Sequence, residues 1–237
     1  MDYDVLILGG GLIGCGVAYE LSKYNLNIAV IEKDYDIADD ISSINTAVVN
    51  DGIGGRSDLM ARLQIMGNSM FDEITEKFDV PFKRLGSLLI ANTEEKVEEL
   101  ERIYKRAVKR GVRDIELIDG KTARKIEKNL RDDVKKALYS KKTGLVAPYD
   151  LALAYAEIAF DNGVNFRLEE EVLDIQKISK ALRVTTNKNK FTCKMVVNTT
   201  PGENYNIDKD IEPSNSREKL NTFIPVSYTH LTLPTKA

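Results

Sequence analysis

Residues 5–14 of this chain read VLILGGGLIG, and residues 28–32 read IAVIE. Two apolar runs of strand length enclose a glycine-rich turn and a segment of helical length, and an acid ends the second run. This order predicts a buried strand, a tight turn, an α-helix and a second buried strand. A βαβ unit of this kind, with glycines at these spacings, is typical of dinucleotide binding.

The glycines of the turn suit that chemistry for separate reasons. Gly9 lets the chain leave the strand in a conformation that a side chain would oppose. Gly11 leaves room for the backbone to approach a pyrophosphate, and Gly14 lets the helix pack close to the strand. The helix that opens at Leu12 and Ile13 would offer unpaired N–H groups and partial positive charge to phosphate groups.

The acid at the end of the second run is Glu32, 18 residues after Gly14. Its carboxylate can accept hydrogen bonds from a ribose diol, and it would repel a 2′-phosphate. The candidate cofactor-binding residues of this unit are Gly9, Gly11, Leu12, Ile13, Gly14, Glu32 and the adjacent Lys33.

Composition excludes several functional classes. A chain of 237 residues with 43% hydrophobic and 30% charged residues is typical of one large or two small globular domains. A net charge of −3 provides no basic surface for nucleic acid. We expect no signal peptide and no transmembrane segment, because Asp2 and Asp4 open the chain and no long apolar run follows. The two cysteines, Cys15 and Cys193, lack ligand neighbours, so we expect no metal site and a cytoplasmic location.

The remaining pattern predicts an α/β protein with an insertion. A polar loop at 34–54 leads to a helix capped by Ser57 or Asp58, then a strand at 86–91 and a helix from an Asn92 cap to Arg110. The first of these helices carries an apolar stripe that we expect in the core, at Leu59, Leu63, Met66, Met70 and Ile74. Further strands are expected at 164–168, 172–178, 182–186 and 191–197, the last returning to the parallel sheet.

These elements suggest a split nucleotide-binding domain at 1–80 and 148–202, with residues 81–147 inserted. Residues 203–237 show no periodicity, and four of the six prolines lie beyond residue 200. Residues 226–237 resemble translated sequencing-adapter read-through, so we expect this end to be non-native. It carries the only histidine, His230, so no catalytic histidine is expected elsewhere.

From the N-terminus to about Asn198 the chain resembles the FAD-dependent oxidoreductases of the D-amino-acid oxidase superfamily, above all the glycerol-3-phosphate dehydrogenase and L-2-hydroxyglutarate oxidase branch. Besides the segment ending at Lys33, the resemblance rests on residues 45–49 (NTAVV), 63–64 (LQ), 67–68 (GN), 81–88 (PFKRLGSL), 137–139 (ALY) and 143–149 (TGLVAPY). It implies a Rossmann-like FAD-binding domain with an inserted α+β substrate domain. Because family members continue well beyond this length, the resemblance implies a fragment that is incomplete at its C-terminus.

The resemblance also implies further cofactor contacts. Ser42, Ser43 and Asn45 would lie along the FAD pyrophosphate, where short hydroxyls and amides can bond phosphate. A plain surface turn is the alternative for this Ser and Asn stretch. Val172 falls where the family holds adenine through backbone atoms.

Two departures from the family pattern stand out. Asn50 occupies a position where relatives often carry a histidine near the flavin. Residues 198–202 read NTTPG where relatives have Asn-Ala-Ala-Gly.

By resemblance, the function is hydride transfer to FAD from a small anionic hydroxy substrate, glycerol 3-phosphate or an L-2-hydroxy acid. Arg84 or Arg56 could bind the anion, although an arginine at such a position is more often a surface residue. The alternatives are an amino-acid oxidase of the same superfamily, an NAD-dependent dehydrogenase, and a nucleotide-binding fragment without turnover. No catalytic base is visible, and the sequence leaves the substrate, the electron acceptor and the oligomeric state open.

Overall fold

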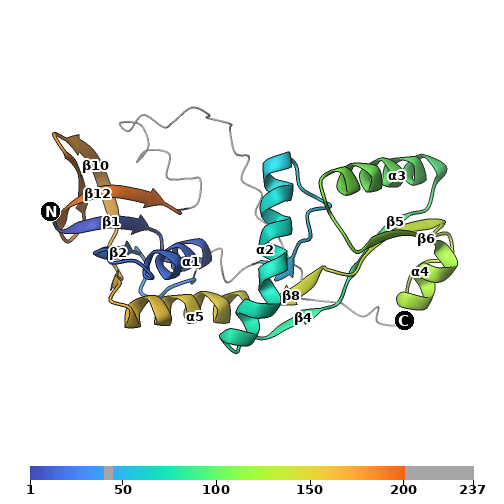
Figure 1. Ribbon diagram of the computed structural model, residues 1–237, viewed down its shortest axis with the longest axis horizontal. Coiled ribbons are helices and arrows are strands. Elements are labelled where there is room, and N and C mark those ends of the chain that lie inside the picture. Colours follow the sequence, from blue (N-terminus) through green and yellow to red (C-terminus); the bar gives the residue numbers. More distant parts are fainter. Residues whose placement is uncertain (40–44, 201–237) are drawn as a thin grey trace, which may run out of the picture. The chain divides into compact units, whose positions relative to one another are not determined.

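The computed structural model describes residues 1–39 and 45–200, and the chain divides into two compact units. The first is built from Met1–Thr46 and the residues from Pro148 onward, and the second from Ala47–Ala147. Ser42, Ser43 and the irregular tail expected at 203–237 lie outside the described residues. Figure 1 follows the chain in colour through both units.

The first unit is a six-stranded sheet in the order β10-β11-β12-β1-β2-β9. Its strands are β1 (Tyr3–Leu8), β2 (Ile28–Ile31), β9 (Asn165–Arg167), β10 (Val172–Ile178), β11 (Ala181–Thr186) and β12 (Lys190–Asn198). The four strands β12, β1, β2 and β9 run parallel, and β10 and β11 extend the sheet beyond β12 as antiparallel neighbours. The predicted strand-turn-helix-strand unit and the return of residues 191–197 beside β1 are both confirmed.

The two central strands β1 and β2 are buried on both faces, which explains the apolar runs at 5–8 and 28–31. Val5 and Ile7 of β1 pack into one cluster with Ala18 of α1 (Leu12–Leu21) and Ala159 of α5 (Pro148–Asp161). The alternate residues Leu6 and Leu8 face the opposite cluster, with residues of β2, β10, β11 and β12. The two helices α1 and α5 therefore cover the same face of the sheet (Figure 1).

The second unit contains two three-stranded antiparallel sheets, β3-β8-β4 and β5-β7-β6. Its elements are β3 (Val48–Val49), α2 (Asp58–Lys77), β4 (Phe82–Arg84), β5 (Ser87–Ala91), α3 (Glu94–Lys109), β6 (Ile115–Asp119), α4 (Gly120–Ile126), β7 (Lys136–Ser140) and β8 (Gly144–Val146). No helix of the described residues is long and apolar enough to cross a lipid bilayer.

The helix ends follow local capping rules. The hydroxyl of Ser57 accepts a hydrogen bond from the Met60 N–H at 3.1 Å, so Ser57 is the cap of α2. Thr93, rather than the expected Asn92, caps α3, because Thr93 has an extended backbone and accepts from the Lys96 N–H at 3.3 Å. Gly111 follows α3 in the left-handed region, with φ +90°.

The position of α2 differs from the sequence-based expectation. The structure groups residues 47–80, α2 included, with the second unit rather than with the first. The side-chain amide of Asn68 on α2 donates to the carbonyl oxygens of Val49, Asn50 and Lys142, at 3.4, 3.2 and 3.0 Å. These contacts join α2 to segments of the second unit on either side of it in the sequence.

The apolar stripe of α2 was expected in the core, and that expectation is wrong. The buried residues of α2 are Ala61, Asn68 and Thr75, which recur every seventh position and so share one face. The stripe lies largely on another face. Its residues Leu59, Leu63, Met66 and Met70 retain 66%, 57%, 55% and 49% of their surface, and only Ile74 is half-buried.

Candidate functional site

The turn after β1 has the conformation that the sequence predicts. Gly9 adopts φ +98°, in the left-handed region where a side chain is strained. Its N–H donates to the Ile31 carbonyl at 2.8 Å, which ties the turn to the end of β2. Any other residue at position 9 would be strained as it linked β1 to α1.

The approach of α1 to this turn depends on Gly14. A Cβ atom built on Gly14 would lie 1.9 Å from the Gly9 carbonyl oxygen, far inside van der Waals contact. The N-cap of α1 is Gly11, and no side chain makes a capping hydrogen bond there. A partial positive charge therefore remains at the start of the helix, as expected for a phosphate-binding turn.

Glu32 lies directly over the same turn. One carboxylate oxygen accepts a hydrogen bond from the Gly10 N–H at 2.6 Å, and the other accepts from the Asp34 N–H at 3.0 Å. The side chain is half-buried, and each oxygen retains a further lone pair for a ligand. The structure thus places a fixed acid beside the glycine turn, where the sequence predicts the ribose.

Gly10 is a site residue that the spacing argument missed. It is buried, and a Cβ atom at this position would lie 3.1 Å from the Glu32 Cβ, so glycine allows the acid to close over the turn. Its carbonyl accepts from the Ala38 N–H at 3.0 Å and from the Cys15 thiol at 3.2 Å. In the sequence, the only sign of this role is that position 10, between Gly9 and Gly11, is also a glycine.

Cys15 is a packing residue of α1. Its side chain is fully buried, and burial raises the pKa of the thiol to about 12, with the Glu32 carboxylate adding to the shift. The thiol is therefore protonated at neutral pH and serves as a weak donor to Gly10 rather than as a nucleophile.

The other predicted cofactor contacts are more widely spread. The Lys33 and Ile13 side chains are exposed, whereas Asn45 is half-buried. Val172 begins β10 opposite Thr186, just before a register shift, and packs against the cluster that contains Leu8. Their contacts to a cofactor stay predictions, as do those of Ser42 and Ser43.

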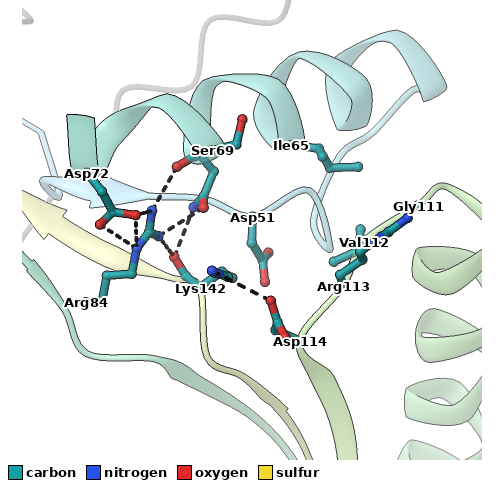
Figure 2. A pocket seen from close by; sticks show the side chains of 11 residues that line it. Asp51, Ile65, Ser69, Asp72, Arg84, Gly111, Val112, Arg113, Asp114 and Lys142 are labelled. Atoms are coloured by element: carbon teal, nitrogen blue, oxygen red, sulfur yellow. Dashed lines mark hydrogen bonds and ion pairs between the residues drawn. The ribbon is translucent and has the colours of Figure 1, made fainter. Parts of the chain in front are cut away.

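The second unit contains a cavity of about 280 Å³ between α2, residues 111–114 and Lys142 (Figure 2). Arg84 lines it, and all of its N–H groups are used within the chain. Its guanidinium donates to the Asp72 carboxylate at 2.8–3.1 Å, to both oxygens of Asn68 at 2.9 and 3.0 Å, and to the Lys142 carbonyl. The hydrogen bonds from Arg84 lower the pKa of Asp72 against the opposing effect of burial. Arg84 thus joins α2 to β4 and leaves no N–H group for an anionic substrate.

Together, the left-handed turn at Gly9, the helix start without a side-chain cap and the fixed carboxylate of Glu32 define a dinucleotide-binding protein. The family model of FAD dependent oxidoreductases matches residues 4–237. The chain therefore belongs to the FAD dependent oxidoreductase family.

Two individual proteins are similar to this chain over most of its length. The chain is 39% identical over 197 residues to a glycerol 3-phosphate dehydrogenase of Caloramator mitchellensis, covering 83% of this chain and 41% of that protein. It is 38% identical over 147 residues to a mitochondrial L-2-hydroxyglutarate dehydrogenase of Caenorhabditis briggsae, covering 61% of this chain and 33% of that protein.

A solved structure shares the fold. The L-alpha-glycerophosphate oxidase of Mycoplasma pneumoniae with FAD bound superposes with a TM-score of 0.75 at 27% identity, covering 82% of this chain and 53% of that one. The chain thus spans about half the length, or less, of the relatives that it matches.

Proposed function

We propose that this chain forms the FAD-binding part of an oxidoreductase that oxidises a small anionic hydroxy compound, glycerol 3-phosphate or an L-2-hydroxy acid. The observation that carries the proposal is the Glu32 carboxylate fixed over the Gly9–Gly14 turn, in a chain of an FAD-dependent family. The first unit would bind the cofactor, and the second would contribute to the substrate side.

The geometry of the turn fits the adenosine and pyrophosphate end of FAD. The backbone N–H groups at the start of α1 would hold the pyrophosphate, because Gly14 admits no side chain there and Gly11 brings no cap. Glu32 would accept hydrogen bonds from the ribose hydroxyls. Lys33, Ser42, Ser43, Asn45 and the backbone of Val172 complete the proposed contacts.

Bound FAD would supply the acceptor for a hydride from the carbon that bears the substrate hydroxyl. The residues of this chain would hold and orient the cofactor for that step. No residue of the chain is proposed as a catalytic base, and the electron acceptor is left open.

The choice of an anionic hydroxy substrate is supported by the names of the relatives, a glycerol 3-phosphate dehydrogenase and an L-2-hydroxyglutarate dehydrogenase. A cytoplasmic setting is part of the proposal. It is supported by Cys15 and Cys193, which are buried free thiols.

Two measurements test this function. FAD added to the purified protein should bind saturably, and anaerobic glycerol 3-phosphate or L-2-hydroxyglutarate should bleach the flavin absorbance. Bleaching by glycine but by neither hydroxy compound would favour an amino-acid oxidase instead. A protein that takes up FAD but is bleached by none of the three would be a nucleotide-binding module without this turnover, and a protein that takes up no FAD would contradict the proposal entirely.

A further inference from the structure

Thr199, directly after β12, reaches back to the cofactor turn. Its N–H donates to the Leu8 carbonyl at 2.9 Å, and its hydroxyl donates to the same carbonyl at 2.7 Å. The hydroxyl oxygen also lies 3.1 Å from the Gly9 carbonyl oxygen. A residue almost 200 positions along the chain thus holds the last carbonyl of β1 and the first carbonyl of the turn.

The Thr199 hydroxyl fills the space that two glycines leave. A Cβ atom on Gly14 would lie 2.9 Å from the Thr199 hydroxyl oxygen, and one on Gly9 would lie 3.2 Å from it. The hydroxyl therefore sits between the end of β1 and the first turn of α1. The contact depends on the hydroxyl of Thr199 in the sequence NTTPG at residues 198–202.

The glycine turn is held from two sides. Glu32 accepts from the Gly10 N–H at 2.6 Å, and Thr199 donates to the carbonyl of Leu8, two residues earlier. The Leu8 carbonyl shares a peptide plane with the Gly9 N–H, which donates to Ile31, and the Gly9 carbonyl shares one with the Gly10 N–H, which donates to Glu32. Thr199 therefore helps to fix the first two peptide planes of the turn that leads into α1.

We propose that Thr199 is a positioning residue for the FAD pyrophosphate, acting through the carbonyls of Leu8 and Gly9 on the turn that receives the phosphates. The inference rests on the proposed FAD-binding function. It predicts that the Thr199 hydroxyl contributes to the binding of the diphosphate and not to the binding of the adenosine.

The neighbouring Thr200 provides a matched control. Its hydroxyl donates to the Asn198 side-chain oxygen at 2.7 Å, and its N–H donates to the same atom at 3.0 Å. These bonds stay within three consecutive residues. Thr200→Val removes a hydroxyl of the same kind, one position along, without removing a bond to the turn.

The experiment measures FAD affinity by flavin fluorescence and the competition of ADP and of adenosine for the same site, for wild type, T199V, T199S and T200V. We expect T199V to weaken FAD and ADP about fivefold and to leave adenosine unchanged, since one hydrogen bond is lost. T199S and T200V should stay within about twofold of wild type. Should T199V fail to fold, T199A is measured against the same criteria.

The possible results separate the two proposals. Unchanged FAD affinity in T199V would overturn the role of Thr199, and so would an equal loss for ADP and adenosine, because that loss indicates a general structural effect. Wild-type protein that does not bind FAD would instead overturn the proposed function itself.

Discussion

The carboxylate of Glu32 accepts a hydrogen bond from the backbone N–H of Gly10 at 2.6 Å, so the acid that ends β2 is joined to the turn that follows β1. This relationship fixes the distance between the proposed ribose acceptor and the proposed phosphate-binding helix. Under the proposed function, the ends of the neighbouring parallel strands β1 and β2 would together bind the adenosine diphosphate moiety of FAD.

Replacing Glu32 should weaken FAD binding. Glu32→Ala removes the acceptor for Gly10 and for the ribose, so we expect the FAD Kd to rise at least about tenfold. Fluorescence titration measures the Kd. Asp34→Asn removes the same charge two residues away and keeps the backbone N–H that Glu32 accepts from, so it should stay near wild type. Equal affinities for the Glu32→Ala variant and wild type would contradict this role.

Substituting Gly14 tests the close approach of helix and turn. Gly14→Ala places a Cβ 1.9 Å from the Gly9 carbonyl oxygen, so the backbone must move and the free energy of unfolding should fall by about 2 kcal/mol or more. Urea denaturation measures it, and FAD binding should be lost as well. Gly16→Ala is the control in the same helix, because its Cβ would meet only Tyr155 at 3.8 Å, and it should be neutral or stabilising. A stable Gly14→Ala variant that binds FAD would disprove the assignment.

Glu170 should make the first unit sensitive to acid. Burial raises the pKa of its carboxyl group, but hydrogen bonds from Thr186, Asn189 and Arg167 outweigh burial, so the pKa is lowered overall from 4.5. A lowered folded-state pKa stabilises the fold above the unfolded value. That stabilisation is lost as the pH falls from about 4.5 through the folded value.

The Glu170→Gln variant tests this assignment, because it leaves Arg167 without its carboxylate. We expect it to lose about 2 kcal/mol at neutral pH, below the cost of breaking a fully buried pair because the Arg167 side chain is 27% exposed, and to show a flatter stability profile below pH 5. Chemical denaturation across pH measures both effects. Glu171→Gln, at an exposed neighbour, should keep the wild-type profile. A Glu170→Gln profile as steep as that of wild type would show that other groups carry the acid sensitivity.

Arg84 should stabilise the second unit without contributing to FAD affinity. Arg84→Lys keeps the charge but cannot bond Asp72, Asn68 and Lys142 together, so we expect a loss of about 2 kcal/mol in unfolding free energy and an unchanged FAD Kd. Arg113→Lys, at an exposed position of the same cavity, is the control. If the Arg84→Lys variant kept full stability but had a raised substrate KM, Arg84 would be a substrate-binding residue and the predicted structural role would be wrong.

The sequence predicts those parts of the structure that depend on residues close together in the chain. The β1-turn-α1-β2 unit follows from glycine spacing and apolar runs, and Gly9 and Gly14 have the roles that their positions indicate. Contacts between distant segments were not predictable. The grouping of α2 with the second unit depends on Asn68 meeting Lys142, 74 residues away. The hydroxyl of Thr199 reaches the Leu8 carbonyl only because β12 pairs with β1 in the folded sheet.

The apolar pattern of α2 predicted the wrong buried face of that helix. The stripe of α2 has helical spacing, yet the helix buries the face of Ala61, Asn68 and Thr75. Periodicity correctly identified a helix, but the buried face carries Asn68, whose hydrogen bonds to Val49 and Lys142 are not visible in the apolar pattern.

The most direct test of the account is a titration of the 237-residue chain with FAD, followed by flavin fluorescence, with NADH as competitor and Gly14→Ala as the negative control. We predict saturable binding of FAD to wild type, no displacement of FAD by NADH, and no FAD binding by the Gly14→Ala variant. The proposed FAD-binding function would be contradicted if folded wild-type chain took up no FAD. It would also be contradicted if NADH displaced bound FAD at an NADH concentration below that of FAD.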